Sequence, residues 1–166
     1  MKDDLDEDYY TDLEEIVNNV EEIVNNAMKK MSDRTGKYLH KLHELGDKKP
    51  DEDTLLKIID NVPSSLSYED DEGWLPIYSA AISKESVQYV PLLAKEGVKH
   101  NAGGDFARGG LLDENNVLKE LAYRADTSQN ADPLYLDVMK TLRKSKLLLR
   151  EDIQDHKLLK GIKADL

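Results

Sequence analysis

The chain has 166 residues, of which 39% are apolar and 34% charged, and none is cysteine. That length allows one domain with a sizeable core. The absence of cysteine excludes disulfides, cysteine nucleophiles, zinc fingers and iron–sulfur clusters. The eight tyrosines, one tryptophan and one phenylalanine are scattered without interleaved basic residues. No nucleic-acid partner is therefore expected.

Two features bear on location. No run approaches the roughly 18 apolar residues of a membrane span, so we expect no membrane partner. The first ten residues, MKDDLDEDYY, are acidic where a signal peptide would be basic and then apolar. We expect an intracellular protein, with the cytoplasm as the default location, and no cofactor.

The formal net charge of −11 is distributed unevenly along the chain. Residues 1–26 contain ten acids against one lysine, whereas residues 140–163 contain eight bases against three acids. Solvated charged faces that keep the protein soluble explain this pattern. The alternative is attraction between the acidic and basic ends, within one molecule or between molecules.

Residues 1–11 form an acidic segment with little to bury, which predicts a disordered tail. Residues 12–35 form the next unit, with a helix from about Asp12 to about Met31 and a break at residues 32–36. Apolar residues recur there at alternating spacings of three and four, and a second row widens the stripe. The stripe predicts packing against the rest of the domain, with self-association as the alternative. Its members are Leu13, Ile16, Val20, Ile23 and Ala27, then Val17, Val24, Met28 and Met31.

Short helices and turns alternate after the break. The pattern predicts one helix over 38–45 that ends at Gly46, and a second that starts at Asp53 or Thr54 and stops before Pro63. A third helix begins at Leu75-Pro76, since proline is favoured in a first turn. A fourth, capped by Ser83 or Ser86, ends at Gly97. Pro91 lies within it and predicts a kink or a late start.

Residues 70–81, DDEGWLPIYSAA, resemble the start of an ankyrin repeat, whose pattern is roughly D-x-x-G-x-T-P-L-H-x-A-A. Several positions match outright, while Ile77 replaces the leucine, and Leu75 and Tyr78 replace the threonine and histidine. Residues 87–98 are similar to the second helix of the family. The repeat length of the family, about 33 residues, agrees with the offset between residues 58–59 and 92–93. The matching residues are Gly73, Pro76, Ala80 and Ala81.

Weaker copies flank this segment, at residues 38–72 and from Asn116 through a helix that begins after Asp132-Pro133. Residues 151–166 are either an incomplete further repeat or a C-terminal cap. The resemblance implies an all-α, ankyrin-like solenoid of about three divergent helix pairs over residues 36–166. The helix over 12–31 would then cap the N-terminal end of the stack.

What the resemblance implies about function is non-catalytic protein–protein interaction through a repeat surface. The partner is a protein whose identity the sequence does not reveal. The alternative is a self-assembling homo-oligomer built by the N-terminal helix or by contacts between the acidic head and the basic tail. The candidate contact residues on the repeat surface are Tyr68, Trp74, Tyr78, Asp105, Phe106 and Arg108.

No residue pattern indicates catalysis or metal binding. His40 and His43 are three apart, whereas a zincin helix needs H-E-x-x-H, so we expect surface or interface residues. The glycine pairs of residues 102–110 lack the Lys-Ser/Thr of a phosphate loop. The acids of residues 69–72 and Asp105 lack calcium-loop spacing, and His100 and His156 stand alone. We therefore expect no enzyme.

Overall fold

In the computed structural model, the structure describes residues 7–103, 109–112, 117–126 and 132–155, which form helices, 3-10 turns and loops without a strand. The all-α class is confirmed for these residues. Seven α-helices follow one another in this part of the chain. They are α1 (Glu7–His40), α2 (Glu52–Asn61), α3 (Pro76–Ala81), α4 (Val90–His100), α5 (Val117–Ala125), α6 (Pro133–Lys144) and α7 (Arg150–Asp155).

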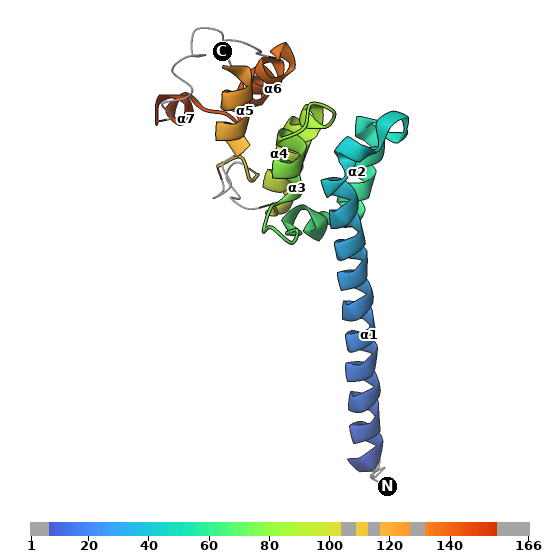
Figure 1. Ribbon diagram of the computed structural model, residues 1–166. Helices are drawn as coiled ribbons and strands as arrows, with labels where there is room; N and C mark the ends of the chain where they lie inside the picture. Colours follow the sequence, from blue (N-terminus) through green and yellow to red (C-terminus); the bar gives the residue numbers. More distant parts are fainter. Residues whose placement is uncertain (1–6, 104–108, 113–116, 127–131, 156–166) are drawn as a thin grey trace.

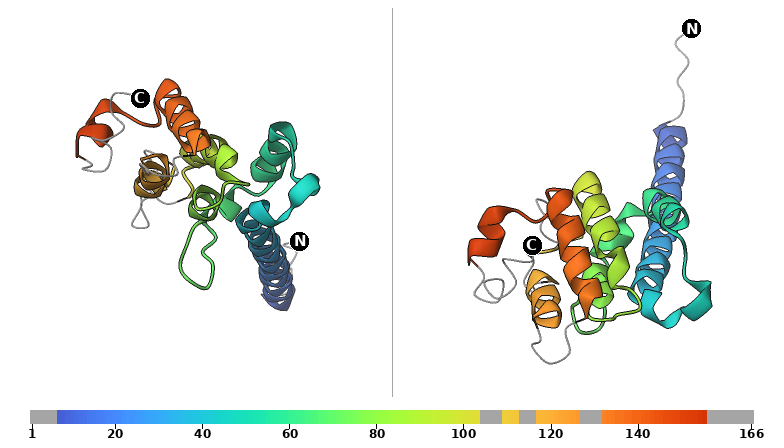
Figure 2. Two further views of the ribbon diagram at one scale, coloured as in Figure 1. Left: turned by 45° about the horizontal axis from the view of Figure 1, so that its top comes forward. Right: turned by 90° about the horizontal axis from the view of Figure 1, so that it is seen from above.

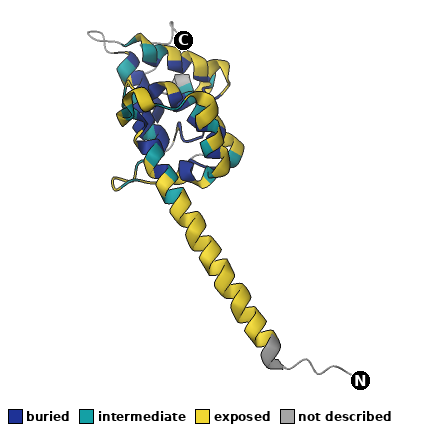
Figure 3. Ribbon diagram, turned by 90° about the vertical axis from the view of Figure 1, so that its right-hand side faces the viewer, coloured by how far each residue is buried: buried dark blue, intermediate teal, exposed yellow. Residues whose placement is uncertain are grey.

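Helix α1 projects from a body that the other helices form (Figure 1). Its 34 residues span about 50 Å at 1.5 Å per residue. Residues 10–31 are exposed all round, and burial begins only in the last turns (Figure 3). The predicted helix over 12–31 is confirmed, but it starts earlier, at Glu7, and the predicted packing of its stripe against the body is wrong.

The predicted break at residues 32–36 is also wrong, because α1 continues through it to His40. Gly36 lies inside the helix, and a Cβ there would overlap the Cβ and Cγ of Tyr68. The glycine is therefore a point of close approach and not a helix end. As a result, α1 caps the body only through its last turns.

The predicted helix over 38–45 is wrong, because the end of α1 and two 3-10 turns occupy this region. Residues 38–40 are the last turn of α1, and Leu42–Glu44 and Gly46–Lys48 are 3-10 turns. Gly46 has a φ of 52°, which suits glycine. Asp51 caps α2, accepting a hydrogen bond from the Thr54 N–H at 2.7 Å, slightly before the predicted start. The helix ends before Pro63, as predicted.

Helix α3 starts at Pro76 and buries Ile77, Ala80 and Ala81, so the predicted start and inner face are confirmed. Helix α4 starts late, with Pro91 in its first turn, which confirms one of the two expected effects of that proline. A 3-10 turn, Val87–Tyr89, precedes it.

The predicted end of the fourth helix at Gly97 is wrong. Helix α4 continues to His100 and ends at Asn101, whose φ is 50°. A Cβ at Gly97 would lie 2.9 Å from the carbonyl oxygen of Ala102 and 2.9 Å from the Cα of Gly109. Gly97 therefore lies inside the helix at a point of close approach, where the following loop folds back against it.

The downstream helices begin close to their predicted positions. Asp132 caps α6, its Oδ1 accepting from the Leu134 N–H at 3.1 Å, and Pro133 occupies the first turn. Within residues 151–166, the structure describes only the part of α7 up to Asp155. Residues 156–166, His156 among them, lie outside the described part of the chain.

The body consists of helices in two rows. The end of α1 contacts α3, and α3 contacts α5; in the other row α2 contacts α4, and α4 contacts α6. Contacts between α3 and α4 and between α5 and α6 join the rows, and Figure 2 shows α4 and α6 side by side. The core lies between the rows. Buried triplets with the same spacing recur in the first row, at residues 36, 39 and 40, then 77, 80 and 81, then 118, 121 and 122.

No helix among the described residues combines the length and the apolar character that crossing a membrane requires.

We predict that Gly36→Ala destabilises the protein, although alanine favours a helix over glycine. The added methyl group overlaps Tyr68, so α1 and the 63–68 segment have to separate, at a cost of about 1–3 kcal/mol. Urea unfolding measures the change. The control is Asn25→Ala on the exposed part of α1, which is expected to leave the free energy of unfolding within about 0.5 kcal/mol. A Gly36→Ala protein as stable as the wild type would contradict the close approach.

Candidate interaction surfaces

A tight turn over residues 70–74 leads into α3. The Oδ1 of Asp70 accepts hydrogen bonds from the N–H groups of Glu72, at 3.0 Å, and Trp74, at 2.8 Å. The backbone closes the turn through Asp70 N–H to Trp74 O and Gly73 N–H to Asp70 O, both at 3.0 Å. Gly73 has a φ of 78°, which a side chain would disfavour. The sequence D-x-x-G-W thus specifies this turn locally.

A cleft of about 510 Å³ lies between the end of α1, the turn and α3. Aromatic side chains and charges of both signs line it, with lysines on the α1 side and aspartates on the turn side. Its lining residues are Lys37, His40, Lys41, His43, Glu44, Tyr68, Asp70, Asp71, Trp74, Ser79 and Ile82.

His40 ties three segments together at the base of this cleft. Its Nδ1 lies 2.6 Å from the Oγ of Ser79, and its Nε2 lies 3.0 Å from the carbonyl oxygen of Tyr68. A carbonyl only accepts, so Nε2 carries the proton and Nδ1 accepts from the Ser79 hydroxyl. The tie links α1 to α3 and to the 63–68 segment. Of the two expected places, surface or interface, His40 occupies the second, since it is buried where these segments meet, whereas His43 is half-exposed.

The same residues do not have the order of a hydrolytic triad. The Asp70 carboxylate lies 3.7 Å from Nδ1 of His40, the nitrogen that Ser79 already uses. In a triad the carboxylate holds one ring nitrogen and the serine uses the other. Ser79 is also buried within α3. The geometry favours a structural tie over nucleophilic catalysis.

The structure brings three of the six candidate contact residues together. Tyr68 and Trp74 line the cleft, both half-buried, and the rings of Trp74 and Tyr78 form an edge-to-face pair with centroids 4.9 Å apart. Burial raises the pKa of Tyr78. Tyr78 thus packs on the tryptophan. The other three candidates, Asp105, Phe106 and Arg108, lie outside the described residues.

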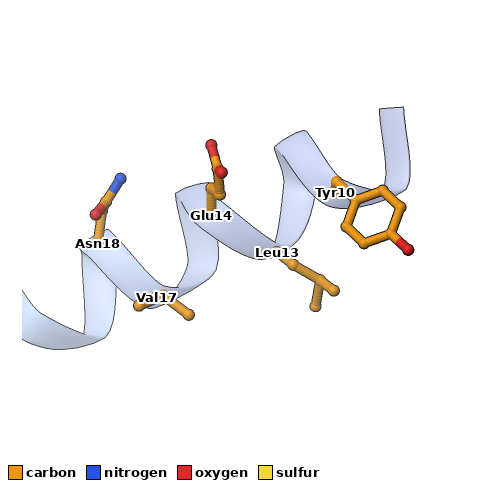
Figure 4. Close-up of a pocket in the computed structure, with 5 residues that line it drawn as sticks. All are labelled: Tyr10, Leu13, Glu14, Val17 and Asn18. Atoms are coloured by element: carbon orange, nitrogen blue, oxygen red, sulfur yellow. The ribbon is translucent and has the colours of Figure 1, made fainter. Parts of the chain in front are cut away.

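The apolar face of α1 is a second surface. Nine of the twelve exposed large hydrophobic side chains found among the described residues lie on this helix. Figure 4 shows Tyr10, Leu13 and Val17 on one side of it, while Glu14 and Asn18 point to the other. Monomeric soluble proteins rarely expose a contiguous apolar patch of this kind, so it indicates an interaction site.

A charged cluster joins the ends of α2 and α4. The Nζ of Lys99 lies 2.7 Å from Asp60 Oδ1 and 3.0 Å from Glu96 Oε2, and Nε2 of His100 lies 3.0 Å from the same oxygen of Asp60. His100 therefore does not stand alone, contrary to expectation. Hydrogen bonds from Lys99 and then from His100 lower the pKa of Asp60, and the bond to Asp60 raises the pKa of Lys99.

Three groups of this cluster, Asp60, Glu96 and His100, offer oxygen and nitrogen atoms within 4.8 Å of one another, close enough to share a metal ion. The ammonium group of Lys99 already binds both carboxylates. A cation would have to displace it. The cluster is accordingly assigned to holding α2 against α4.

Sequence reasoning missed the His40 tie and this cluster. The segments that they join are 28 to 40 residues apart in the chain, and a single sequence carries no signal for such pairs. The one local signal is the spacing of Glu96 and His100, one turn apart on the same face of α4. Comparisons with protein-family models, with curated proteins and with solved structures find no match to the chain.

We predict that Asp60→Asn makes stability less sensitive to acid. Because folding lowers the pKa of Asp60, its ion pairs contribute fully above the unfolded value of about 3.9 and are lost as the pH falls through the folded value. The urea midpoint of the wild type is therefore expected to drop more between pH 5 and pH 2.5 than that of the variant. Asp137→Asn, at an exposed position of α6, is the control. Equal acid sensitivity of wild type and Asp60→Asn would contradict the assignment.

Proposed function

We propose that the protein is a non-catalytic protein–protein interaction adaptor whose body is a divergent ankyrin-type stack of helix pairs. The two rows of helices and the D-x-x-G turn before α3 support the ankyrin-type assignment. In this reading α1 and α2, α3 and α4, and α5 and α6 are the three pairs. Stacking each pair on the next buries faces that no pair buries alone.

The observation that carries the adaptor function is the cleft beside the 70–74 turn. Ankyrin-type proteins are expected to bind partners with their turns and first helices, and the cleft lies between such a turn and two first helices. Half-buried Tyr68 and Trp74 offer apolar area with little side-chain entropy to lose, as in binding hot spots. Lys41 and Asp71, both exposed, place opposite charges at its rim. This surface suits a polypeptide segment that carries an apolar anchor between charged groups.

A second candidate function is self-assembly through α1. The exposed apolar face of this helix favours it, because large apolar side chains from Leu13 to Met31 are exposed on it. The related alternative, contact between the acidic head and the basic tail, takes three of its ten acids and three of its eight bases from residues 1–6 and 156–166, which lie outside the described part of the chain. Self-assembly and the adaptor function are compatible, because the apolar face of α1 and the cleft are separate surfaces.

The adaptor proposal is tested by reversing the charges at the rim of the cleft. The double variant Lys41→Glu/Asp71→Lys keeps the net charge and is expected to lower capture of partner proteins from the source cell at least tenfold. Quantitative mass spectrometry measures the capture. The matched control, Lys140→Glu/Asp137→Lys, exchanges the same charges at exposed positions of α6. Unchanged capture by the folded cleft variant would remove the cleft as the binding surface.

A further inference from the structure

We infer that the apolar face of α1 pairs with the same face of a second copy of this chain, with the two helices antiparallel. The inference rests on the second candidate function, self-assembly through α1, and not on the cleft. The need for an occupant comes from helix energetics. Most helices in proteins depend on packing of an apolar face, and the exposed part of α1 contains four asparagines, at 18, 19, 25 and 26, which favour the helix only weakly.

The apolar face has three rows, each with a seven-residue repeat. One row is the a position of a heptad, the next is d, and the third is g. Three rows are wider than the two-row seam of a simple parallel coiled coil. The rows are Tyr10, Val17, Val24 and Met31; Leu13, Val20 and Ala27; and Ile16 and Ile23.

This face points away from the body, so a second helix can reach it. The side of α1 that faces the body carries Gly36, Leu39 and His40. At about 100° per residue, this side lies on average about a third of a turn or more around the helix from the three apolar rows. The stripe therefore cannot continue into the body's own core.

Charge decides the direction of the pair. The first half of α1, residues 7–22, contains seven acids and no base, whereas residues 23–40 contain four bases and one acid. A parallel pair would place the acidic halves side by side. An antiparallel pair places each acidic half beside the basic half of the other copy, and it also opposes the helix dipoles. The four bases are Lys29, Lys30, Arg34 and Lys37.

The heptad defines one register that uses the whole exposed length. In antiparallel pairs, a positions face d positions. With Val20 opposite Val24 of the second copy, all the other layers match as well: Val17 with Ala27, Leu13 with Met31, and Tyr10 with Arg34. The overlap from residue 10 to residue 34 is about 37 Å long.

The third row favours the same arrangement. In the antiparallel register Ile23 faces its own copy, and Ile16 faces the aliphatic part of Lys30. In a parallel pair Ile16 would instead face the carboxylate of Glu21. One pair of like charges remains close in the antiparallel pair, between Glu21 and its own copy near the centre. This single repulsion is outweighed by the attraction between acids and bases along both ends.

An antiparallel pair places the two bodies at opposite ends of a shared two-helix rod. Each body keeps its cleft exposed, because the cleft lies at the body and the pairing face lies on residues 10–31 of α1. Two clefts on one rigid particle raise the effective concentration for a partner that carries two binding segments. The pair is therefore a bivalent form of the proposed adaptor.

Disulfide trapping tests the direction, and the absence of native cysteine makes single-cysteine variants unambiguous. Leu13→Cys and Met31→Cys chains, one carrying a size tag, are oxidised separately and as a mixture. The antiparallel register predicts that the mixed disulfide exceeds either same-variant disulfide at least tenfold. Ile23→Cys is expected to link to itself. Same-variant links of Leu13→Cys and of Met31→Cys without mixed enrichment indicate a parallel pair and overturn the inference, while self-assembly stands.

Light scattering on the full chain tests whether the pair forms at all. The double variant Val17→Ser/Val24→Ser keeps similar helix propensity and is expected to raise the dimer dissociation constant at least tenfold. The matched control Asn18→Ser/Asn25→Ser changes the next residue in each case, on the polar side, and stays dimeric. Circular dichroism of each variant reports helix content. A wild type that is monomeric at high micromolar concentration overturns both the inference and self-assembly, whereas the cleft experiment remains a separate measure of the adaptor function.

Discussion

The junction between α1 and the body is the constraint on which the rest of the structure depends. Gly36 allows Tyr68 to lie against the helix, and His40, four residues later, bonds to the carbonyl of Tyr68 and to Ser79 of α3. These contacts hold the link between α2 and α3 against α1. They also set the angle at which α1 leaves the body, and so determine which side of α1 faces away from the body.

The body is held together mainly by close packing of small and branched residues, with polar ties at its edges. Ala80 and Ala81 in α3 and Gly97 in α4 allow backbones to approach. Ion pairs such as Lys84 with Asp132, at 2.7 Å, join successive helix pairs. Because exposed pairs of this kind contribute little stability, they mainly set the relative placement of loops and helices whose packing energy comes from the core.

The two candidate surfaces are physically different, and this difference favours separate roles. The cleft is small, mixed in charge and built on the rigid junction, which suits recognition of a segment of another protein. The face of α1 is long, apolar and flanked by charges that change sign along its length, which suits a long helix of complementary charge. A second copy of the same chain supplies such a helix in one orientation only.

The sequence by itself determined the helical class, the presence of a helix over residues 12–31, and most helix starts. These features depend on local chemistry: an apolar period of 3.6, a proline in a first turn at residues 76, 91 and 133, and an aspartate at the caps of α2 and α6. Asp70 and Gly73 likewise specify their turn within five residues. The candidates Tyr68 and Trp74 were found because interface-prone aromatic residues flank that turn.

Only the tertiary structure decided where the chain does not break and what each face contacts. Gly36 and Gly97 look like helix ends in the sequence, yet both lie inside helices, because each glycine makes room for a segment that is distant along the chain or folds back. The same reason explains why the sequence did not reveal the contacts of His40 or the cluster around Lys99. Their partners depend on how helices stack. The apolar stripe of α1 faces outward because of the rotation of the helix about its own axis at the junction, and not because of its composition.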